Sequence, residues 1–178
     1  MTEADEYGNT PLMIALAESS SAKIKKCIEE EKNFDRQNVN GANALMIAIQ
    51  HGKNINAILS KTLDLKAKNS NGLTALQLAI ISRRTSTAKE ILKRDPETAR
   101  ISDKDGNTPI MTACFCGNKS IIVALAKIGV DTKAKNNKGL TIVDAVGLGS
   151  NPKLTDMVIF IWQSGKWGPD FGKFSGEY

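Results

Sequence analysis

Histidine, cysteine and aromatic residues are all scarce in this chain of 178 residues. His51 is the only histidine, which removes most arrangements that a metal site or a catalytic triad would need. Cys27, Cys114 and Cys116 are too few, and odd in number, for a disulfide scaffold, so a reducing compartment is the default. Aromatic residues make up 5% of the chain, which argues against a core built around large rings.

Long apolar runs and a targeting segment are missing as well. No uninterrupted apolar run approaches the roughly 18 residues that a membrane span requires, so membrane insertion is not expected. Residues 1–6 are acidic and lack the basic start and the apolar stretch of a signal peptide. A cytoplasmic location is therefore the default, and the alternative is a periplasmic or secreted protein whose leader has been removed.

The net charge of +5 is distributed unevenly along the chain. Residues 1–35 carry eight acids and four bases, a net of −4, whereas residues 36–178 carry eleven acids and twenty bases, a net of +9. A basic segment of this size can attract nucleic acid, an anionic membrane or an acidic protein face. Its lysines are spread among Asn, Asp and Glu without a run of five or more, which favours a solvated surface.

A short phrase centred on a glycine recurs five times in the chain. It reads Gly-Asn-Thr-Pro-Leu at 8–12 and returns as Gly-Asn-Thr-Pro-Ile at 106–110. The glycines follow one another at spacings of 33, 31, 34 and 33 residues, at Gly8, Gly41, Gly72, Gly106 and Gly139. Seven residues after the glycine stands a small residue in four of the five repeats, namely Ala15, Ala48, Ala79 and Ala113, and Val146 in the fifth. A fixed period of this length is the signature of a repeat architecture.

Each part of the phrase has a structural reason. Asn and Asp before the glycine bond their own backbone in turns, and the glycine supplies the positive φ that a tight turn needs. Pro11 and Pro109 stand at the first helical position, where a missing N–H costs nothing, and Gly129 is placed to end a second helix. Threonines occupy the expected helix N-caps, at Thr10, Thr74, Thr108 and Thr141.

These residues resemble the ankyrin-repeat family, whose unit is a β-turn or hairpin finger followed by two antiparallel helices. The resemblance covers roughly residues 5–165 and implies an all-α repeat fold, an α-solenoid of stacked helix-turn-helix units with short β-turn or hairpin fingers. We expect five repeats at about 5–37, 38–68, 69–102, 103–135 and 136–165. They would form a single domain over 1–166, followed by an aromatic and glycine-rich tail at 167–178.

The chain departs from the family pattern at two kinds of position. The histidine of the family's Thr-Pro-Leu-His phrase is absent, so the hydrogen-bond network that it supports in the family is in question. The glycine that separates the two helices of a unit is Ser19 in the first unit and Arg83 in the third. The residues standing in place of the histidine are Met13, Met46, Gln77, Met111 and Asp144.

No residue pattern in the chain indicates catalysis. The sulfurs of Cys114 and Cys116 would point about 200° apart on a helix, and their spacing matches no zinc motif. Gly147-Leu148-Gly149 lacks the preceding strand and the Lys-Ser/Thr end of a phosphate-binding loop. No pair of acids is placed for acid–base work. We therefore expect no catalytic residue, no metal, no cofactor and no small-molecule substrate.

The resemblance also implies where a partner would bind, namely on the fingertips and the exposed face of the first helices, which together form a concave surface. At these helix positions units three to five carry large apolar residues, whereas the first two units carry polar or small ones. An apolar centre with a charged rim is typical of a protein-binding site. The alternative is that these side chains pack between repeats or are covered by the tail. The candidate residues are Tyr7, Leu73, Ile81, Lys104, Asp105, Phe115, Cys116, Lys138, Leu140 and Leu148.

The sequence therefore predicts a non-catalytic protein–protein interaction module, an adaptor or inhibitor that docks on another folded protein. The alternative is a binder of nucleic acid or another anionic surface through the basic repeats three to five, with nucleic acid the less favoured partner. We expect the free chain to be a monomer. The aromatic tail, with Trp167 and Phe171, is expected to cap the fifth repeat together with Trp162, and its alternative role is a partner contact.

Overall fold

The computed structural model describes residues 4–18, 21–149 and 151–165. The aromatic tail at 167–178 and Ser19 lie outside these residues, so the cap expected from the tail falls there too. In the described ranges all regular secondary structure is helical and no strand is present. The predicted all-α repeat fold is therefore confirmed, with fingers that are turns instead of hairpins of paired strands.

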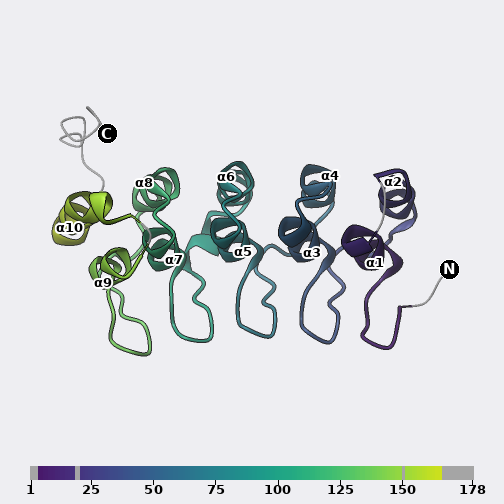
Figure 1. The fold of residues 1–178 in the computed structure, drawn as a ribbon, viewed down its shortest axis with the longest axis horizontal. Coiled ribbons are helices and arrows are strands. Elements are labelled where there is room, and N and C mark those ends of the chain that lie inside the picture. The colour runs from purple at the N-terminus through teal and green to yellow at the C-terminus, as the bar shows by residue number, and fades with distance from the viewer. Residues whose placement is uncertain (1–3, 19–20, 150, 166–178) are drawn as a thin grey trace.

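The helices follow one another in antiparallel pairs, each preceded by a finger loop (Figure 1). The first helices are α1 (Pro11–Glu18), α3 (Ala44–His51), α5 (Ala75–Ile81), α7 (Pro109–Phe115) and α9 (Ile142–Gly147). The second helices are α2 (Ser21–Glu30), α4 (Ile55–Leu59), α6 (Thr85–Arg94), α8 (Lys119–Ile128) and α10 (Thr155–Ser164). Short 3-10 helices, η1 (Pro96–Arg100) and η2 (Pro152–Leu154), follow α6 and precede α10. Across the described part of the chain, no helix has the length and apolar character to cross a membrane.

The pairs stack side by side, with the first helices in one row, α2, α4, α6 and α8 in a second row, and the fingers projecting from the first (Figure 1). Helix α10 lies lower, beside α9, and its packing against α9 closes the described end of the stack. The residues seven positions after the finger glycines are fully buried: Ala15, Ala48, Ala79, Ala113 and Val146.

The first helices begin at the predicted caps. The Thr10 hydroxyl accepts a hydrogen bond from the N–H of Met13 at 3.3 Å, and Thr74 accepts one from Gln77 at 3.4 Å. In the second unit Asn43 replaces the threonine and accepts from Met46 at 3.0 Å. These side chains satisfy N–H groups that a helix start leaves without a partner.

Each finger is closed by the Asn or Asp residue that begins it. The Asp103 carboxylate accepts from the N–H of Asp105 at 3.0 Å and from the N–H of Asn107 at 2.8 Å. Gly106 adopts a φ of +77° and donates its N–H to the Asp103 carbonyl at 3.2 Å. The predicted turn chemistry is thus confirmed, and the same two side-chain bonds recur at Asp5, Asn38, Asn69 and Asn136.

Neighbouring fingers are joined by one backbone hydrogen bond each. The donor is always the residue two before a finger glycine, and the acceptor is the residue one before the preceding finger glycine. The four bonds run from Val39 to Tyr7 at 2.9 Å, Ser70 to Asn40 at 2.8 Å, Lys104 to Asn71 at 3.3 Å and Asn137 to Asp105 at 2.9 Å. The fingers therefore form a continuous band beside the first helices.

Two departures from the family pattern have visible consequences in the third unit. Gln77, which stands where the family has its histidine, is fully buried and donates from Nε2 to the Asn107 carbonyl of the next finger at 3.0 Å. Arg83 has a φ of +55° where Gly52 and Gly117 lie at +68° and +66° in the neighbouring units. For a non-glycine residue this left-handed conformation costs about 1–2 kcal/mol.

Candidate functional site: a cleft between two fingers and three first helices

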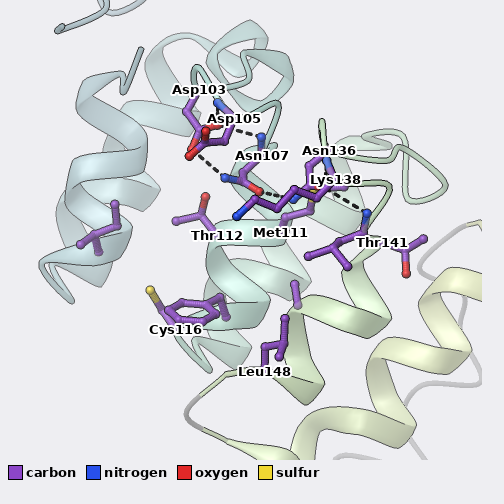
Figure 2. Close-up of a pocket in the computed structure, with 14 residues that line it drawn as sticks. Asp103, Asp105, Asn107, Met111, Thr112, Cys116, Asn136, Lys138, Thr141 and Leu148 are labelled. Carbon is purple, nitrogen blue, oxygen red and sulfur yellow. Dashed lines mark hydrogen bonds between the residues drawn. The ribbon is translucent and has the colours of Figure 1, made fainter. Parts of the chain in front are cut away.

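A cleft of about 410 Å³ lies between the fourth and fifth fingers and three first helices (Figure 2). From α5, α7 and α9 and the residues that directly follow them come Ile81, Met111, Thr112, Phe115, Cys116, Ala145 and Leu148. From the fingers come Asp103, Asp105, Asn107, Asn136, Lys138, Leu140 and Thr141. The stacking of units three to five thus builds one concavity from residues more than 60 positions apart.

The helix side of the cleft carries three large apolar residues at the same position of successive units, which we term the apolar strip: Ile81, Phe115 and Leu148. Their side chains are 47%, 53% and 65% exposed. The residues just before the first two, Ile80 and Cys114, are fully buried because they face the helix rows. The core therefore does not require apolar side chains at the strip positions.

The floor of the cleft contains residues that are not among the predicted partner-binding residues. Met111 is buried, and Thr112 and Ala145 are half-buried. Met111 and Thr112 precede Phe115 by four and three residues, so they lie on the same face of α7. That helical spacing was the signal available in the sequence for extending the site from the strip to its floor.

The finger side of the cleft is held by a chain of side-chain hydrogen bonds. Asn107 donates from Nδ2 to Asp103 at 3.0 Å, and Asn136 donates from Nδ2 to the Asn107 side-chain oxygen at 2.7 Å (Figure 2). Asp105 and Lys138 are exposed beside this chain, and neither side chain has an ion pair or hydrogen bond to another described residue. The cleft thus combines a fixed polar side with two available charges of opposite sign.

Seven of the predicted partner-binding residues line this cleft: Ile81, Asp105, Phe115, Cys116, Lys138, Leu140 and Leu148. Tyr7 lies apart from it, 58% exposed on the first finger, and Lys104 is exposed at the tip of the fourth. Leu73 is half-buried on the third finger and packs against the core. Leu140, at the same position of the fifth finger, does line the cleft.

The two cysteines near the cleft differ in environment. Cys114 is in the core, and its burial raises the pKa of the thiol to about 12. Cys116 is half-buried in the cleft, where burial raises the pKa of its thiol and the nearby Arg83 guanidinium partly offsets the increase. Among the described residues, no three His, Cys, Asp or Glu side chains come together as metal ligands.

Comparison with known proteins finds a family model and several relatives that resemble parts of this chain. The family described as "Ankyrin repeats (3 copies)" matches residues 55–136. The chain is 29% identical over 130 residues to the transient receptor potential cation channel subfamily A member 1 of Homo sapiens, covering 71% of this chain and 12% of that protein. It is 26% identical over 147 residues to the homolog from Caenorhabditis elegans, covering 81% of this chain and 12% of the relative.

A third relative is the B-cell lymphoma 3 protein of Homo sapiens, 28% identical over 120 residues, covering 62% of this chain and 26% of that protein. The chain therefore spans from 12% to 26% of the length of these relatives.

The matched region runs from α4 to the start of the fifth finger. It accounts for three copies, and our assignment of five repeats rests on the helix pairs and finger bonds that continue on both sides of it. Ankyrin repeats generally mediate protein–protein interaction and are typically non-catalytic. Residues 55–136 thus match the ankyrin-repeat family, and the finger turns and paired helices on both sides of that region have the same arrangement.

Proposed function

We propose that this chain is a non-catalytic protein-binding module, an adaptor or an inhibitor, that docks on a folded partner protein through the cleft and its apolar strip. The apolar strip carries this proposal. Ile81, Phe115 and Leu148 place large apolar side chains in contact with water at positions where the first two units have Ala17 and Gln50. Exposed apolar side chains gathered on one surface mark interaction sites in soluble proteins.

The form of the cleft supports the same proposal. An aromatic ring at the centre of an apolar strip is a typical hot spot, and the surrounding charges of Asp105 and Lys138 would favour a partner with complementary groups. The hydrogen-bonded chain through Asp103, Asn107 and Asn136 keeps the finger side fixed before a partner arrives. A preformed surface loses less conformational entropy on binding and so retains more of its contact energy.

The experiment has two stages. The full chain is immobilised, partners are captured from native cell extract and identified by mass spectrometry, and the affinity of each is then measured for variants. Phe115→Ala should weaken binding by about 2 kcal/mol or more, a factor of roughly thirty. Gln50→Ala, at the same position of the second unit, is the matched control and should leave affinity nearly unchanged.

Two results would contradict the proposal. In the first, Phe115→Ala binds the partner with unchanged affinity. In the second, Phe115→Ala unfolds, and its remaining folded fraction binds the partner normally. In the second case Phe115 is a core residue instead of a contact residue. Circular dichroism and a denaturant titration of each variant separate these cases, because they report the folded fraction independently of binding.

A second candidate function, binding to nucleic acid or another anionic surface, is favoured by one observation on the second-helix row. The groove between α6 and α8 is lined by Lys89, Lys119 and Lys127 around Ser120, Val123 and Ala124. Phosphate binding there should weaken steeply as salt rises, whereas an apolar-centred protein interface should weaken only modestly. Lys89→Ala with Lys119→Ala should abolish salt-sensitive binding and leave binding through Phe115 intact.

A further inference from the structure

The turn between α5 and α6 contains an arginine in a conformation that favours glycine. Arg83 has a φ of +55°, and the equivalent turns of the second and fourth units contain Gly52 and Gly117. Within the described residues, Asn54 is the other non-glycine residue with positive φ, and asparagine tolerates this region far better than arginine. An interaction of the Arg83 side chain would explain why arginine occupies this unfavourable backbone conformation.

Contacts within the described part of the chain do not supply that reason. The Arg83 side chain is exposed and has no hydrogen bond or ion pair to another described residue. Its neighbour Arg84 differs, because the Arg84 guanidinium lies so close over Gly52 that a Cβ there would collide with it. Arg84 is thus engaged in packing between units, whereas the Arg83 guanidinium is available to a molecule outside the chain.

Arg83 is close to two residues that line the cleft. It is the second residue after Ile81, the last residue of α5, and directly follows the C-cap residue Ser82. Its positive charge acts on Cys116, where it favours the thiolate against the effect of burial. Ile81 and Cys116 both line the cleft. Arg83 therefore adds a cation where α5 and α7 end, away from the fingers that carry Asp105 and Lys138.

We propose that Arg83 binds a carboxylate of the partner, and that the partner segment combines a large apolar side chain for the cleft with an Asp or Glu nearby. This inference rests on the proposed function and names the chemistry of its ligand. A guanidinium matches a carboxylate with two parallel hydrogen bonds, and an apolar neighbourhood strengthens the pair.

The test uses a phage-displayed library of random dodecapeptides selected on the immobilised full chain, and on Phe115→Ala and Arg83→Gly variants. Selection on the unmodified chain should enrich peptides that pair a large apolar residue with Asp or Glu at a fixed spacing. A synthetic peptide of the enriched sequence should bind Arg83→Gly at least tenfold more weakly. A peptide in which the acid is replaced by the matching amide should lose the same affinity for the unmodified chain. Its affinity for Arg83→Gly should fall little further, because the acid and Arg83 form one contact that either change removes.

The Arg83→Gly substitution separates binding from folding. Glycine fits the left-handed backbone without penalty, so this variant should melt at or above the temperature of the unmodified chain. Arg83→Lys, which keeps the charge but not the planar guanidinium, should bind with intermediate affinity. Lys25→Ala removes the same charge from the exposed face of α2, far from the cleft, and should leave peptide affinity unchanged.

Each alternative outcome overturns the inference. Peptides that require Phe115 but show no acidic preference would overturn it while leaving the proposed function standing. An equal loss for Lys25→Ala and Arg83→Gly would show a net-charge effect instead of a contact. A library that yields no Phe115-dependent peptide would also overturn it, and the partner captured from extract, measured against Phe115→Ala, would then decide the proposed function separately.

Discussion

Gly149 lies directly against the backbone of Phe115. A Cβ at residue 149 would stand 2.8 Å from the Cα of Phe115 and closer still to its carbonyl oxygen. The backbone of Gly149 does not have the positive φ that favours glycine. Glycine is required here because the Phe115 backbone leaves no room for a side chain. The turn after α9 thus supports the end of α7, where the aromatic residue of the apolar strip stands.

Gly149→Ala should therefore disturb both stability and the cleft. The added methyl group can be accommodated only by moving the Phe115 backbone, which should cost about 1–3 kcal/mol of unfolding free energy and weaken partner binding. Gly147→Ala is the matched control, because a Cβ there meets no atom within 4 Å. Urea titration and partner affinity of both variants provide the measurement, and equal behaviour of the two would contradict the prediction.

Ala113→Leu should destabilise the stack. Ala113 is fully buried in α7 between neighbouring units, so a larger side chain overpacks the helix interface at a cost of about 1–3 kcal/mol. The same holds for Ala79→Leu in α5. Ala57→Leu, on the exposed surface of α4, should change little. If the denaturant midpoint of Ala113→Leu equals that of the unmodified chain, the packing described for this position is wrong.

Gln77→Met tests how the third unit compensates for the missing histidine. Methionine already stands at this position in three other units, as Met13, Met46 and Met111. In the third unit it would remove the bond from Gln77 to the Asn107 carbonyl and leave that carbonyl without its partner, at a cost of about 1–3 kcal/mol. Calorimetry would detect the lowered melting temperature, and an unchanged melt would show that the bond contributes nothing net.

Alkylation with iodoacetamide should distinguish the two cysteines of the fourth unit. A raised pKa makes the reactive thiolate scarcer at a given pH. With its pKa at about 12, Cys114 should remain unmodified at pH 8 until the chain unfolds. Cys116 should react slowly and faster as pH rises, and a bound partner should protect it. Peptide mapping by mass spectrometry gives both rates, and equal native rates would refute this assignment.

The features that sequence predicts well are those governed by local chemistry. Turn residues such as Asp103 and Gly106 are fixed by their own backbone bonds, and caps such as Thr74 by the helix that follows. The burial of Ala113 also follows from a short repeated pattern, because each unit meets the same neighbour on each side. These features are periodic, and one correct alignment of the units supplies all of them.

The cleft is less predictable because it depends on how units differ. Leu73 and Leu140 share one repeat position, yet Leu73 packs on the core and Leu140 lines the cleft. A single alignment treats the two as equivalent. Arg83 illustrates a further limit, since its departure from glycine is visible in the sequence but its left-handed backbone and available charge are not. Met111 could have been included from its place one turn before Phe115 on α7.

The backbone hydrogen bonds between neighbouring fingers are equivalent at every junction between units. From Val39 to Asn137, every donor and every acceptor holds the same place relative to its own glycine, and the bonds involve no side chain. If a unit is deleted or duplicated between equivalent glycines, the fingers that become neighbours can therefore form the same backbone hydrogen bond. Gene duplication can lengthen such a protein one unit at a time, while the side chains on the exposed face diverge freely to suit a new partner.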